Sequence, residues 1–484
     1  MTQSLLQNIR SFFKPAIETV IPEKSRKIRL SGKSLRIPVS GYPEYKIEMG
    51  KQTLLLCADP DLGGHAADTP CDFILFDPER YFSGISHYLR LPPGNTLVLD
   101  SKIEYQEHVF SFPREAFRRH LSIAHTGDAL VFKDTISELG TYLSLVDDSP
   151  EASSITGRRK TALKRIKQIF GGPLEPLPVD KATETLMQVN ALLRHETGRH
   201  EDSLGNPGCL LELPDHITPI LVGDLHAQLD NLLTILSENA FMECLERGTA
   251  ALIVMGDAVH QEQPGRLEEM DSSLLIMDLI FRLKVTYPGQ VFFIVGNHDG
   301  FHHELMKQGI PQGLLWEKHV SATRGETYRE QLQLFYQLSP LVILTRDFIA
   351  CHAGPPRRKI SRETLIDAHQ FPDIVHDLTW SRIKTPAFPA GYTRSDVRQF
   401  RKGLEVDSET PLIVGHYPLT KDDTLWLNAC QINQYHILIS SRPDRIAIIT
   451  RIDGQLVPQI YPTEPLLDWL NRQPATDLQS TEAG

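Results

Sequence analysis

The chain has 484 residues, which is too many for one ordinary domain and predicts at least two. Hydrophobic residues make up 41% of the sequence, enough for real cores, and the formal net charge of −11 argues against a nucleic-acid backbone as the main partner. The 6 cysteines lie far apart without a CxxC pair, which indicates reduced thiols rather than a disulfide framework.

Residues 1–29 are predicted to form a helical segment, because their apolar side chains fall on one helical face. These side chains are Leu5, Leu6, Ile9, Phe12 and Phe13. We expect the helix to dock on the body of the protein; contact with a partner or a membrane surface is the alternative. The segment lacks the features of a secretion signal, and no apolar run in the chain is long enough to cross a bilayer. We therefore expect a cytoplasmic protein without a transmembrane segment.

Residues 30–147 show short apolar runs separated by Gly, Pro, Asp and Asn, a pattern typical of an all-β sandwich. The predicted strands are Ser34–Val39, Thr53–Ala58, Phe73–Phe76, Thr96–Leu99, Val109–Phe112, His120–Ile123, Ala129–Phe132 and Tyr142–Val146.

Residues 148–210 are predicted to be a linker with helical segments. The stretch opens with polar and small residues, and it contains a basic cluster between Arg158 and Lys167. Such a cluster is typical of a solvated helix face.

Residues 211–465 alternate apolar strand-like runs with helical runs, which indicates an α/β layered domain. The predicted strands are Ile220–Val222, Ala251–Met255, Val291–Val295, Leu341–Leu344, Phe348–Cys351 and Leu412–Val414. Residues 466–484 are expected to be a polar tail. The whole chain is thus predicted to be multidomain, an all-β sandwich followed by an α/β domain.

Five short polar motifs stand at the carboxyl ends of the α/β strands, where loops of such a sheet converge on one crevice. Glycine precedes the polar residue in four of them and allows a sharp turn there. The motifs are Gly223-Asp224-Leu225-His226, Gly256-Asp257-Ala258-Val259-His260, Gly296-Asn297-His298-Asp299, Cys351-His352-Ala353-Gly354 and Gly415-His416-Tyr417-Pro418.

Imidazole, carboxylate and amide oxygen are the ligands of a pair of divalent metals such as Mn, Fe or Zn. One carboxylate must bridge the two ions to reduce their repulsion. By order and setting, Asp257 is the expected bridge. Asp224 and His226 would complete one metal site, and Asn297, His352 and His416 would complete the other.

The order of these motifs resembles the calcineurin-like metallophosphoesterases and, more closely, the phosphoprotein phosphatase family. The stretch Asp377–Ser381 (DLTWS) is similar to the DLLWS stretch of that family, and Phe400–His416 is similar to its last helix and strand. The resemblance covers about residues 211–451. It implies a hydrolase in which a metal-bridged hydroxide attacks phosphorus while the catalytic His298 protonates the leaving oxygen.

The sequence departs from that family directly after the second motif, where the family has Asp-Arg-Gly. Here His260, Gln261 and Glu262 occupy these positions. An imidazole cannot replace the carboxylate as a simple acceptor for a charged His298, so we expect the His298 proton to be held differently. The phosphate-holding arginine must come from elsewhere, and Arg394 or Arg357, with its neighbour Arg358, is the candidate.

The segment between Arg118 and Thr141 resembles the second half of a forkhead-associated (FHA) domain, which implies a β sandwich whose loops bind phosphothreonine. His120, Gly140 and Thr141 match the FHA pattern. Phe117 and Leu139 replace its loop Ser and Asn, so we expect the fold without the phosphothreonine site. A phosphopeptide or protein partner at this domain remains an alternative.

Three functions fit these patterns. The first is a phosphoprotein phosphatase for Ser/Thr or Tyr substrates, regulated or targeted by the β sandwich. The second is a nucleotide or dinucleoside-polyphosphate hydrolase. The third is a non-catalytic phosphopeptide-binding scaffold, which the intact set of predicted ligands argues against, because nothing else requires a bare carboxylate at a strand end.

Overall fold

The computed structural model describes residues 17–20, 26–30, 32–39, 43–62, 71–99, 103–105, 108–110, 121–134, 140–146 and 154–473. The chain divides into two compact units, Met1–Thr161 and Ala162–Gly484. The boundary falls within helix α3 (Ile155–Phe170).

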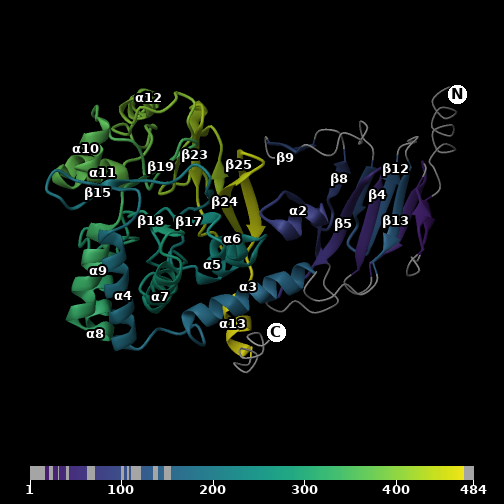
Figure 1. The fold of residues 1–484 in the computed structure, drawn as a ribbon, viewed down its shortest axis with the longest axis horizontal. Coiled ribbons are helices and arrows are strands. Elements are labelled where there is room, and N and C mark those ends of the chain that lie inside the picture. Colours follow the sequence, from purple (N-terminus) through teal and green to yellow (C-terminus); the bar gives the residue numbers. More distant parts are fainter. Residues whose placement is uncertain are drawn as a thin grey trace. The chain divides into compact units, whose positions relative to one another are not determined.

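The first unit contains two mainly antiparallel sheets, as the ribbon in Figure 1 shows. One has the order β1 (Ile17–Thr19), β3 (Ser34–Pro38), β12 (Ala129–Asp134), β11 (Leu121–His125) and β8 (Thr96–Leu99). The other has the order β2 (Ile28–Arg29), β13 (Thr141–Leu145), β4 (Glu44–Met49), β5 (Gln52–Asp59), β6 (Asp72–Phe76) and β7 (Tyr88–Leu91). A short helix, α2 (Pro78–Ser83), and a ribbon of β9 (Ile103–Tyr105) and β10 (His108–Phe110) complete the described elements.

The two sheets share one apolar core, which confirms the prediction of an all-β region. In β4 the alternate residues Tyr45, Ile47 and Met49 are buried while their neighbours are partly exposed, the period of a half-buried strand. Tyr45 meets Phe132 of the opposite sheet edge-to-face, with ring centroids 6.1 Å apart. The FHA-like identity stays a prediction, because His120 and the loop residues 135–139 lie outside the described residues.

The prediction of a helical segment over residues 1–29 is wrong where the structure describes it. β1 pairs with β3, and β2 pairs with β13, so both pieces are strands. Pairing with a neighbouring strand satisfies the backbone groups of a short segment and overrides its local pattern. Leu5 to Phe13, which carried the helical pattern, lie outside the described residues.

The segment predicted to be a linker is largely built into regular structure. α3 is followed by α4 (Val179–Arg194), and then by strands β14 (Arg199–Glu201) and β15 (Pro207–Glu212), which belong to a sheet of the second unit. Its basic cluster is only partly a solvated face: Lys164 and Arg165 are exposed, whereas Arg158, Arg159 and Lys167 are buried. Lys167 is buried, and its Nζ donates to the carbonyls of Leu470 at 2.9 Å and Gln473 at 2.7 Å. A long side chain can thus be buried when its cation reaches carbonyl acceptors.

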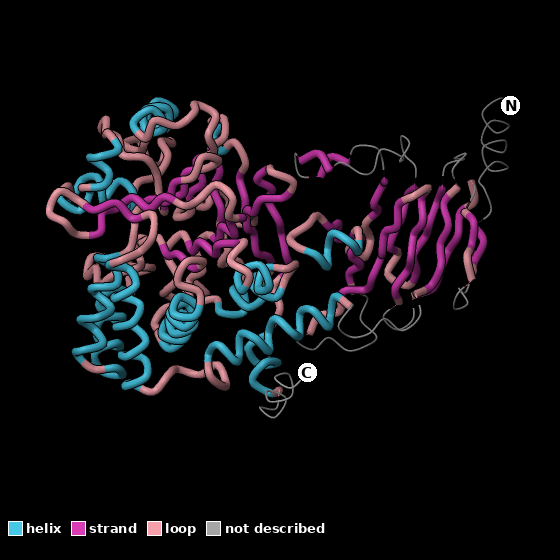
Figure 2. Tube along the Cα trace, in the orientation of Figure 1, coloured by secondary structure: helices cyan, strands magenta, loops and turns pink. Residues whose placement is uncertain are grey.

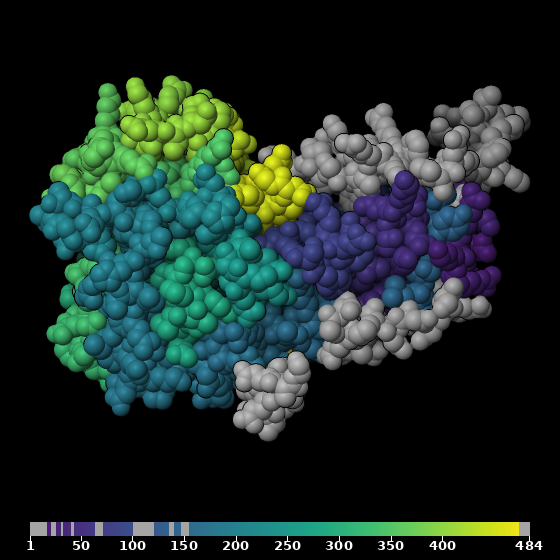
Figure 3. Space-filling model, viewed as in Figure 1, coloured from purple at the N-terminus to yellow at the C-terminus, as the bar shows by residue number. Residues whose placement is uncertain are grey.

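The second unit contains a seven-stranded and a five-stranded sheet. The first has the order β14, β15, β19 (Val342–Leu344), β20 (Ile349–Cys351), β21 (Leu412–Val414), β23 (Tyr435–Leu438) and β22 (Leu425–Trp426). The second has the order β18 (Val291–Phe293), β17 (Ala250–Val254), β16 (Thr218–Val222), β24 (Arg445–Ile452) and β25 (Gln455–Pro462). Part of the C-terminal stretch, in yellow, reaches the surface on the face shown in Figure 3.

One apolar core lies between these two sheets, with Leu221, Ile253 and Ile449 from the smaller sheet and Ile343 and Ile413 from the larger. Helices cover both outer faces, so the unit has four layers (Figures 1 and 2). This confirms the predicted α/β architecture. The helices are α4, α5 (Leu229–Ser237), α6 (Phe241–Glu246), α7 (Asp271–Thr286), α8 (Gln312–Arg324), α9 (Glu326–Leu338), α10 (Arg362–Ile366), α11 (Pro372–Trp380), α12 (Arg394–Gly403) and α13 (Leu466–Arg472), with short 3₁₀ turns η2 (Ala368–Gln370) and η3 (Ala429–Gln431).

Helix α13 corrects the prediction that residues 466–484 are a polar tail. Leu466 and Leu470 are one helical turn apart and both are fully buried, which explains why this piece is ordered as a helix. Residues 474–484 lie outside the described residues. None of the helices in the described part of the chain has the length and apolar character needed to cross a membrane.

Candidate metal centre

Seven polar side chains follow the carboxyl ends of five strands and come together in the second unit. Asp224 and His226 follow β16, Asp257 follows β17, Asn297 and His298 follow β18, His352 follows β20, and His416 follows β21. Six of the seven are buried, and His416 is partly buried. Strands of both sheets therefore contribute to one cluster.

The cluster contains two sets of three donor atoms that lie within 4.8 Å of one another. One set is Asp224, His226 and Asp257, and the other is Asp257, His352 and His416. Asp257 belongs to both, which is the arrangement expected of a carboxylate shared by two ions. The donors are imidazole nitrogens and carboxylate oxygens, which suit divalent transition metals.

The orientation of His352 leaves one of its nitrogens facing the cluster. Its Nδ1 lies 2.8 Å from the Met255 carbonyl, which can only accept, so Nδ1 carries the proton. Nε2 then points to Asp257 Oδ2 at 3.4 Å and to Asn297 Oδ1 at 3.1 Å. A second partner that fixes the tautomer in this way is typical of metal-binding histidines.

His226 and His416 are oriented in the same manner. Nδ1 of His226 lies 3.4 Å from the Val259 carbonyl, and its Nε2 lies 3.9 Å from Asp224 Oδ2. Nε2 of His416 lies 3.2 Å from the Trp380 carbonyl, which leaves Nδ1 to face the cluster. Each imidazole is thus held at one nitrogen by a backbone carbonyl and turns its other nitrogen towards the cluster.

The buried carboxylates create a negative potential at the centre of the cluster. Burial alone would lower the pKa of His352, but the carboxylates of Asp257 and Asp224 raise that pKa to about 9. Burial would likewise raise the pKa of Asp257, but His352 and His298 hold it well below its usual range. A negative potential that raises the pKa of an imidazole this far would also attract a metal cation to the site.

Two glycines permit the close approach of the site loops. Gly256 has φ +90°, and a Cβ there would lie 2.6 Å from the Gly296 nitrogen and 2.8 Å from Nδ1 of His352. A Cβ on Gly296 would lie 2.2 Å from Oδ1 of Asp257. Both positions therefore require glycine if the donors are to stay where they are.

Asp299 joins these loops through hydrogen bonds to their backbone. Its Oδ2 accepts hydrogen bonds from the backbone nitrogens of Asp257 at 2.6 Å and Gly296 at 2.9 Å, and its Oδ1 accepts one from Ala258 at 3.2 Å. Asp257 Oδ1 in turn accepts a hydrogen bond from the His298 nitrogen at 2.8 Å. The loops after β17 and β18 are thereby fixed relative to each other.

His260 lies directly beside His298, with the two Nδ1 atoms 3.0 Å apart. The pKa of His260 is lowered to about 3, mainly by burial and to a smaller extent by the nearby His226, so the His260 ring is neutral. Burial also holds the pKa of His298 well below its usual range. One Nδ1 must donate and the other must accept, so the pair is joined as two neutral rings. His298 therefore has an imidazole, His260, as its partner where the resemblance led us to compare a carboxylate.

The two arginines predicted to hold a phosphate have other partners. Arg357 donates from its Nε to Asp377 Oδ1 at 3.1 Å and pairs with the same oxygen through NH2 at 2.9 Å. Arg394 is exposed at the start of α12 and donates to the carbonyl of Gln431. Neither guanidinium forms a hydrogen bond or ion pair with the seven clustered side chains.

Sequence reasoning missed Arg382, which follows the DLTWS stretch directly. Its guanidinium carbon lies 4.6 Å from the ring centroid of Phe388 and 4.8 Å from that of Tyr417. Tyr417 is the neighbour of His416, whose pKa burial lowers to about 3, with His352 and Arg382 contributing. Among the described residues no carboxylate pairs with Arg382, so two rings hold a cation with free donors beside the cluster.

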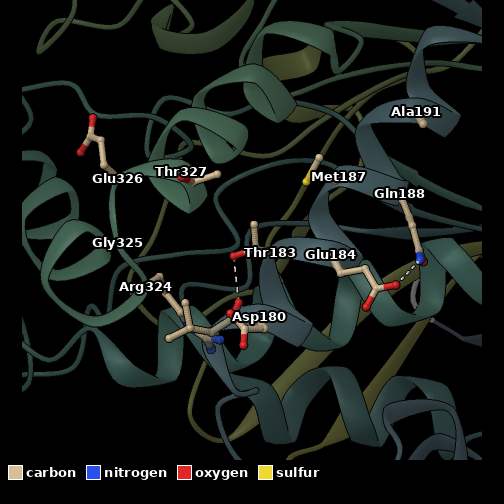
Figure 4. A pocket seen from close by; sticks show the side chains of 11 residues that line it. Asp180, Thr183, Glu184, Met187, Gln188, Ala191, Arg324, Gly325, Glu326 and Thr327 are labelled. Carbon is tan, nitrogen blue, oxygen red and sulfur yellow. Dashed lines mark hydrogen bonds between the residues drawn. The ribbon is translucent and has the colours of Figure 1, made fainter.

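A separate pocket of about 660 Å³ lies between α4 and the turn from α8 to α9, and none of the clustered residues lines it (Figure 4). Arg324 lines this pocket, but its guanidinium forms an ion pair inside the protein, with NH2 2.6 Å from Oδ2 of the buried Asp278. Met187 and Val179 are exposed beside acidic residues of α4. The pocket is therefore distinct from the candidate metal centre.

Comparison with known proteins gives one family match, which falls in the second unit. Residues 217–441 match the family described as calcineurin-like phosphoesterase. No curated protein matches the chain in sequence. A protein serine/threonine phosphatase from Saccharomyces cerevisiae, with similarity to human phosphatase PP5, is similar in structure with a TM-score of 0.44 and 14% identity, over 59% of this chain and 90% of that one. A cold-active protein-tyrosine phosphatase of a psychrophilic Shewanella species has a TM-score of 0.36 and 15% identity, over 52% of this chain and 83% of that one.

Proposed function

We propose that this chain, whose residues 217–441 form a calcineurin-like phosphoesterase domain, hydrolyses phosphomonoesters and acts on phosphorylated proteins. The observation that carries the proposal is the pair of donor sets that share Asp257. Such a pair is the protein part of a two-metal phosphoesterase site. The first set would hold one divalent ion, and the second set, with Asn297, would hold the other.

The donor chemistry fits Mn, Fe or Zn, because imidazole and carboxylate are combined. When bound, two such ions would supply a nucleophile from water near neutral pH and would neutralise charge on the phosphoryl oxygens. The chain supplies the fixed geometry: Asp299 and the two glycines hold Asp257, and backbone carbonyls fix the histidine tautomers.

His298 is the proposed donor of the proton to the leaving oxygen. If His298 Nδ1 donates to His260 Nδ1, a second proton taken up by His298 sits on Nε2, which lies 4.0 Å from Asp257 Oδ2 on the cluster side. Giving that proton to the leaving oxygen would return His298 to the neutral ring, and the charge of the phosphoryl group, not a carboxylate partner, would favour the charged imidazole beforehand. His260 is the positioning residue in this scheme.

Arg382 is the proposed binding residue for the phosphoryl group. Its two flanking rings limit its motion, and a guanidinium offers several donors to phosphate oxygens. Arg357 and Arg394 are less suited to this role because their donors have other acceptors.

The first unit is proposed to bring a phosphorylated protein or another protein partner to the enzyme. The support is its all-β architecture together with the FHA-like pattern around Gly140 and Thr141. Binding of phosphothreonine peptides to the full chain, measured by fluorescence anisotropy against unphosphorylated peptides, tests this part.

The experiment that tests the enzyme is Mn²⁺-dependent phosphate release from phosphoserine, phosphothreonine and phosphotyrosine peptides, with nucleotide phosphates alongside. Asp257→Asn is the control variant, because it removes the shared carboxylate. Peptide turnover that disappears in the variant supports the phosphatase and ranks its substrates. Turnover of nucleotides alone moves the assignment to a nucleotide hydrolase, and no metal-dependent turnover of any compound refutes the proposed activity.

A further inference from the structure

On the His226 side of the cluster, the residues that follow His260 offer no cation. Gln261 is buried, and its side-chain amide lies 3.3 Å from the Ala227 carbonyl and 3.2 Å from Ser272 Oγ. Glu262, the next residue, is a carboxylate. A phosphoryl dianion bound at the cluster would therefore need a cation from another loop on this side.

We propose that Lys307 is that cation and binds a phosphoryl group on the His226 side of the cluster, while Arg382 binds it near His416. The inference rests on the proposed function and names a second substrate-binding residue for it. Lys307 was not part of any sequence motif, and the structure brings it to the site through a contact with Glu262.

The geometry places the Lys307 ammonium next to the donors of the cluster. Oε1 of Glu262 pairs with Lys307 Nζ, and the same oxygen lies 3.4 Å from Nε2 of His226. Glu262, His226 and His298 have donor atoms within 4.8 Å of one another. The ammonium is thus one carboxylate oxygen away from a candidate metal ligand, His226, and the same carboxylate group lies near the proposed proton donor.

A tight turn holds Lys307 in this place. The backbone nitrogen of Lys307 donates to the Ile310 carbonyl at 2.9 Å, and that of Ile310 donates to the Lys307 carbonyl at 2.9 Å. Gln308 and Gly309 between them have φ of 50° and 83°, the conformation of a two-residue hairpin turn. The side chain is 38% exposed, so a ligand entering the cluster from solvent can reach it.

Glu262 gives Lys307 a partner when no phosphoryl group is bound. A dianion placed between His226 and Lys307 would compete with the Glu262 carboxylate for the ammonium. Removing the two members of the pair should therefore have opposite effects: loss of Lys307 weakens binding of the anion, and loss of the Glu262 charge strengthens it.

Calorimetric titration of the Mn²⁺-loaded full chain with inorganic phosphate tests this without turnover. We expect Lys307→Met to raise the Kd for phosphate about 10- to 100-fold, the loss of one charge-assisted hydrogen bond. Lys307→Arg should stay within about threefold of the wild type, and Glu262→Gln should lower the Kd. The matched control is Lys318→Met, since Lys318 is an exposed lysine of α8 without a partner among the described residues.

A Kd for Lys307→Met within twofold of the wild type overturns the inference, and so does weaker binding in Glu262→Gln. Tryptophan fluorescence of each variant shows whether it is folded, and if Lys307→Met is not, the opposite shift in Glu262→Gln decides. If the wild type releases no phosphate from any ester yet binds phosphate through Lys307, the proposed activity fails and this inference stands. If esters are hydrolysed but Lys307→Met binds phosphate normally, only this inference fails.

Discussion

Asp299 accepts hydrogen bonds from three backbone nitrogens of the site loops, and Asp299→Asn changes only one oxygen of that group. The side chain is 1% exposed, so water cannot replace a lost partner. The Asn oxygen can still accept from Asp257 and Gly296, the two donors to Oδ2. Its NH₂ group must then face the N–H of Ala258, so two donors meet without an acceptor.

The magnitude follows from these contacts. Burial, with the nearby Asp257, raises the pKa of Asp299 to about 7, so the comparison is made at pH 8, where the carboxylate is charged. One buried donor without a partner then costs about 1–3 kcal/mol, and the other two bonds lose the strength that a charged acceptor gave them, about 1 kcal/mol together. We expect the free energy of unfolding of the second unit to fall by about 2–4 kcal/mol. Because Asp257 sits on the loosened loop, Mn²⁺ affinity should fall about 10- to 100-fold as well.

Urea unfolding followed by tryptophan fluorescence measures the first quantity, since all 4 tryptophans lie between residues 316 and 469 and report on the second unit alone. Equilibrium dialysis with Mn²⁺ measures the second. Asp422→Asn, at an exposed position, is the control. Unchanged stability and unchanged Mn²⁺ affinity in Asp299→Asn would refute the role given to this carboxylate.

Three further changes test other parts of the structure. Arg324→Met leaves buried Asp278 unpaired and should lower the free energy of unfolding by about 3–5 kcal/mol. Burial raises the pKa of Asp278 to about 6, so this group favours the folded state when it is protonated, below about pH 4, and that contribution is lost as pH rises through 6. Urea unfolding should therefore show a smaller loss of stability in the variant at pH 5, where Asp278 is protonated, than at pH 8. Arg382→Met should raise KM for a phosphoester at least about tenfold while Arg394→Met leaves it unchanged in the same steady-state assay. Gly256→Ala, at φ +90°, should cost about 1–3 kcal/mol by urea unfolding and weaken Mn²⁺ binding in dialysis; equal affinity would count against the tight loop packing.

Where the structure describes them, the predicted strands of both units agree with it, because short apolar runs between turn residues have few other conformations. The hairpin of β24 and β25 was missed although its signal is present: Asp453-Gly454, with φ of 51° and 79°, is a typical two-residue turn between alternating strands. The helical segments of the predicted linker are present, but its two strands were missed for a different reason. β14 and β15 are strands only because the larger sheet offers an edge far along the chain.

The clustering of the seven site residues could be anticipated from the sequence, since each follows a strand and strand ends converge. The cations around them could not. Arg357 follows a site motif but binds Asp377, whereas Arg382 and Lys307 belong to no site motif and lie near the cluster. Which arginine or lysine lies near the cluster depends on side-chain contacts that only the folded chain defines.

The donors of the candidate metal centre follow five strands, of which three belong to the five-stranded sheet and two to the seven-stranded one. Apolar packing between two sheets is non-directional. Ions held at this edge would be cross-links between the layers with fixed bond directions. Cofactor loading would then couple the two sheets into one cooperative unit, so that amide exchange within strands such as β17 and β21 reports whether the centre is filled.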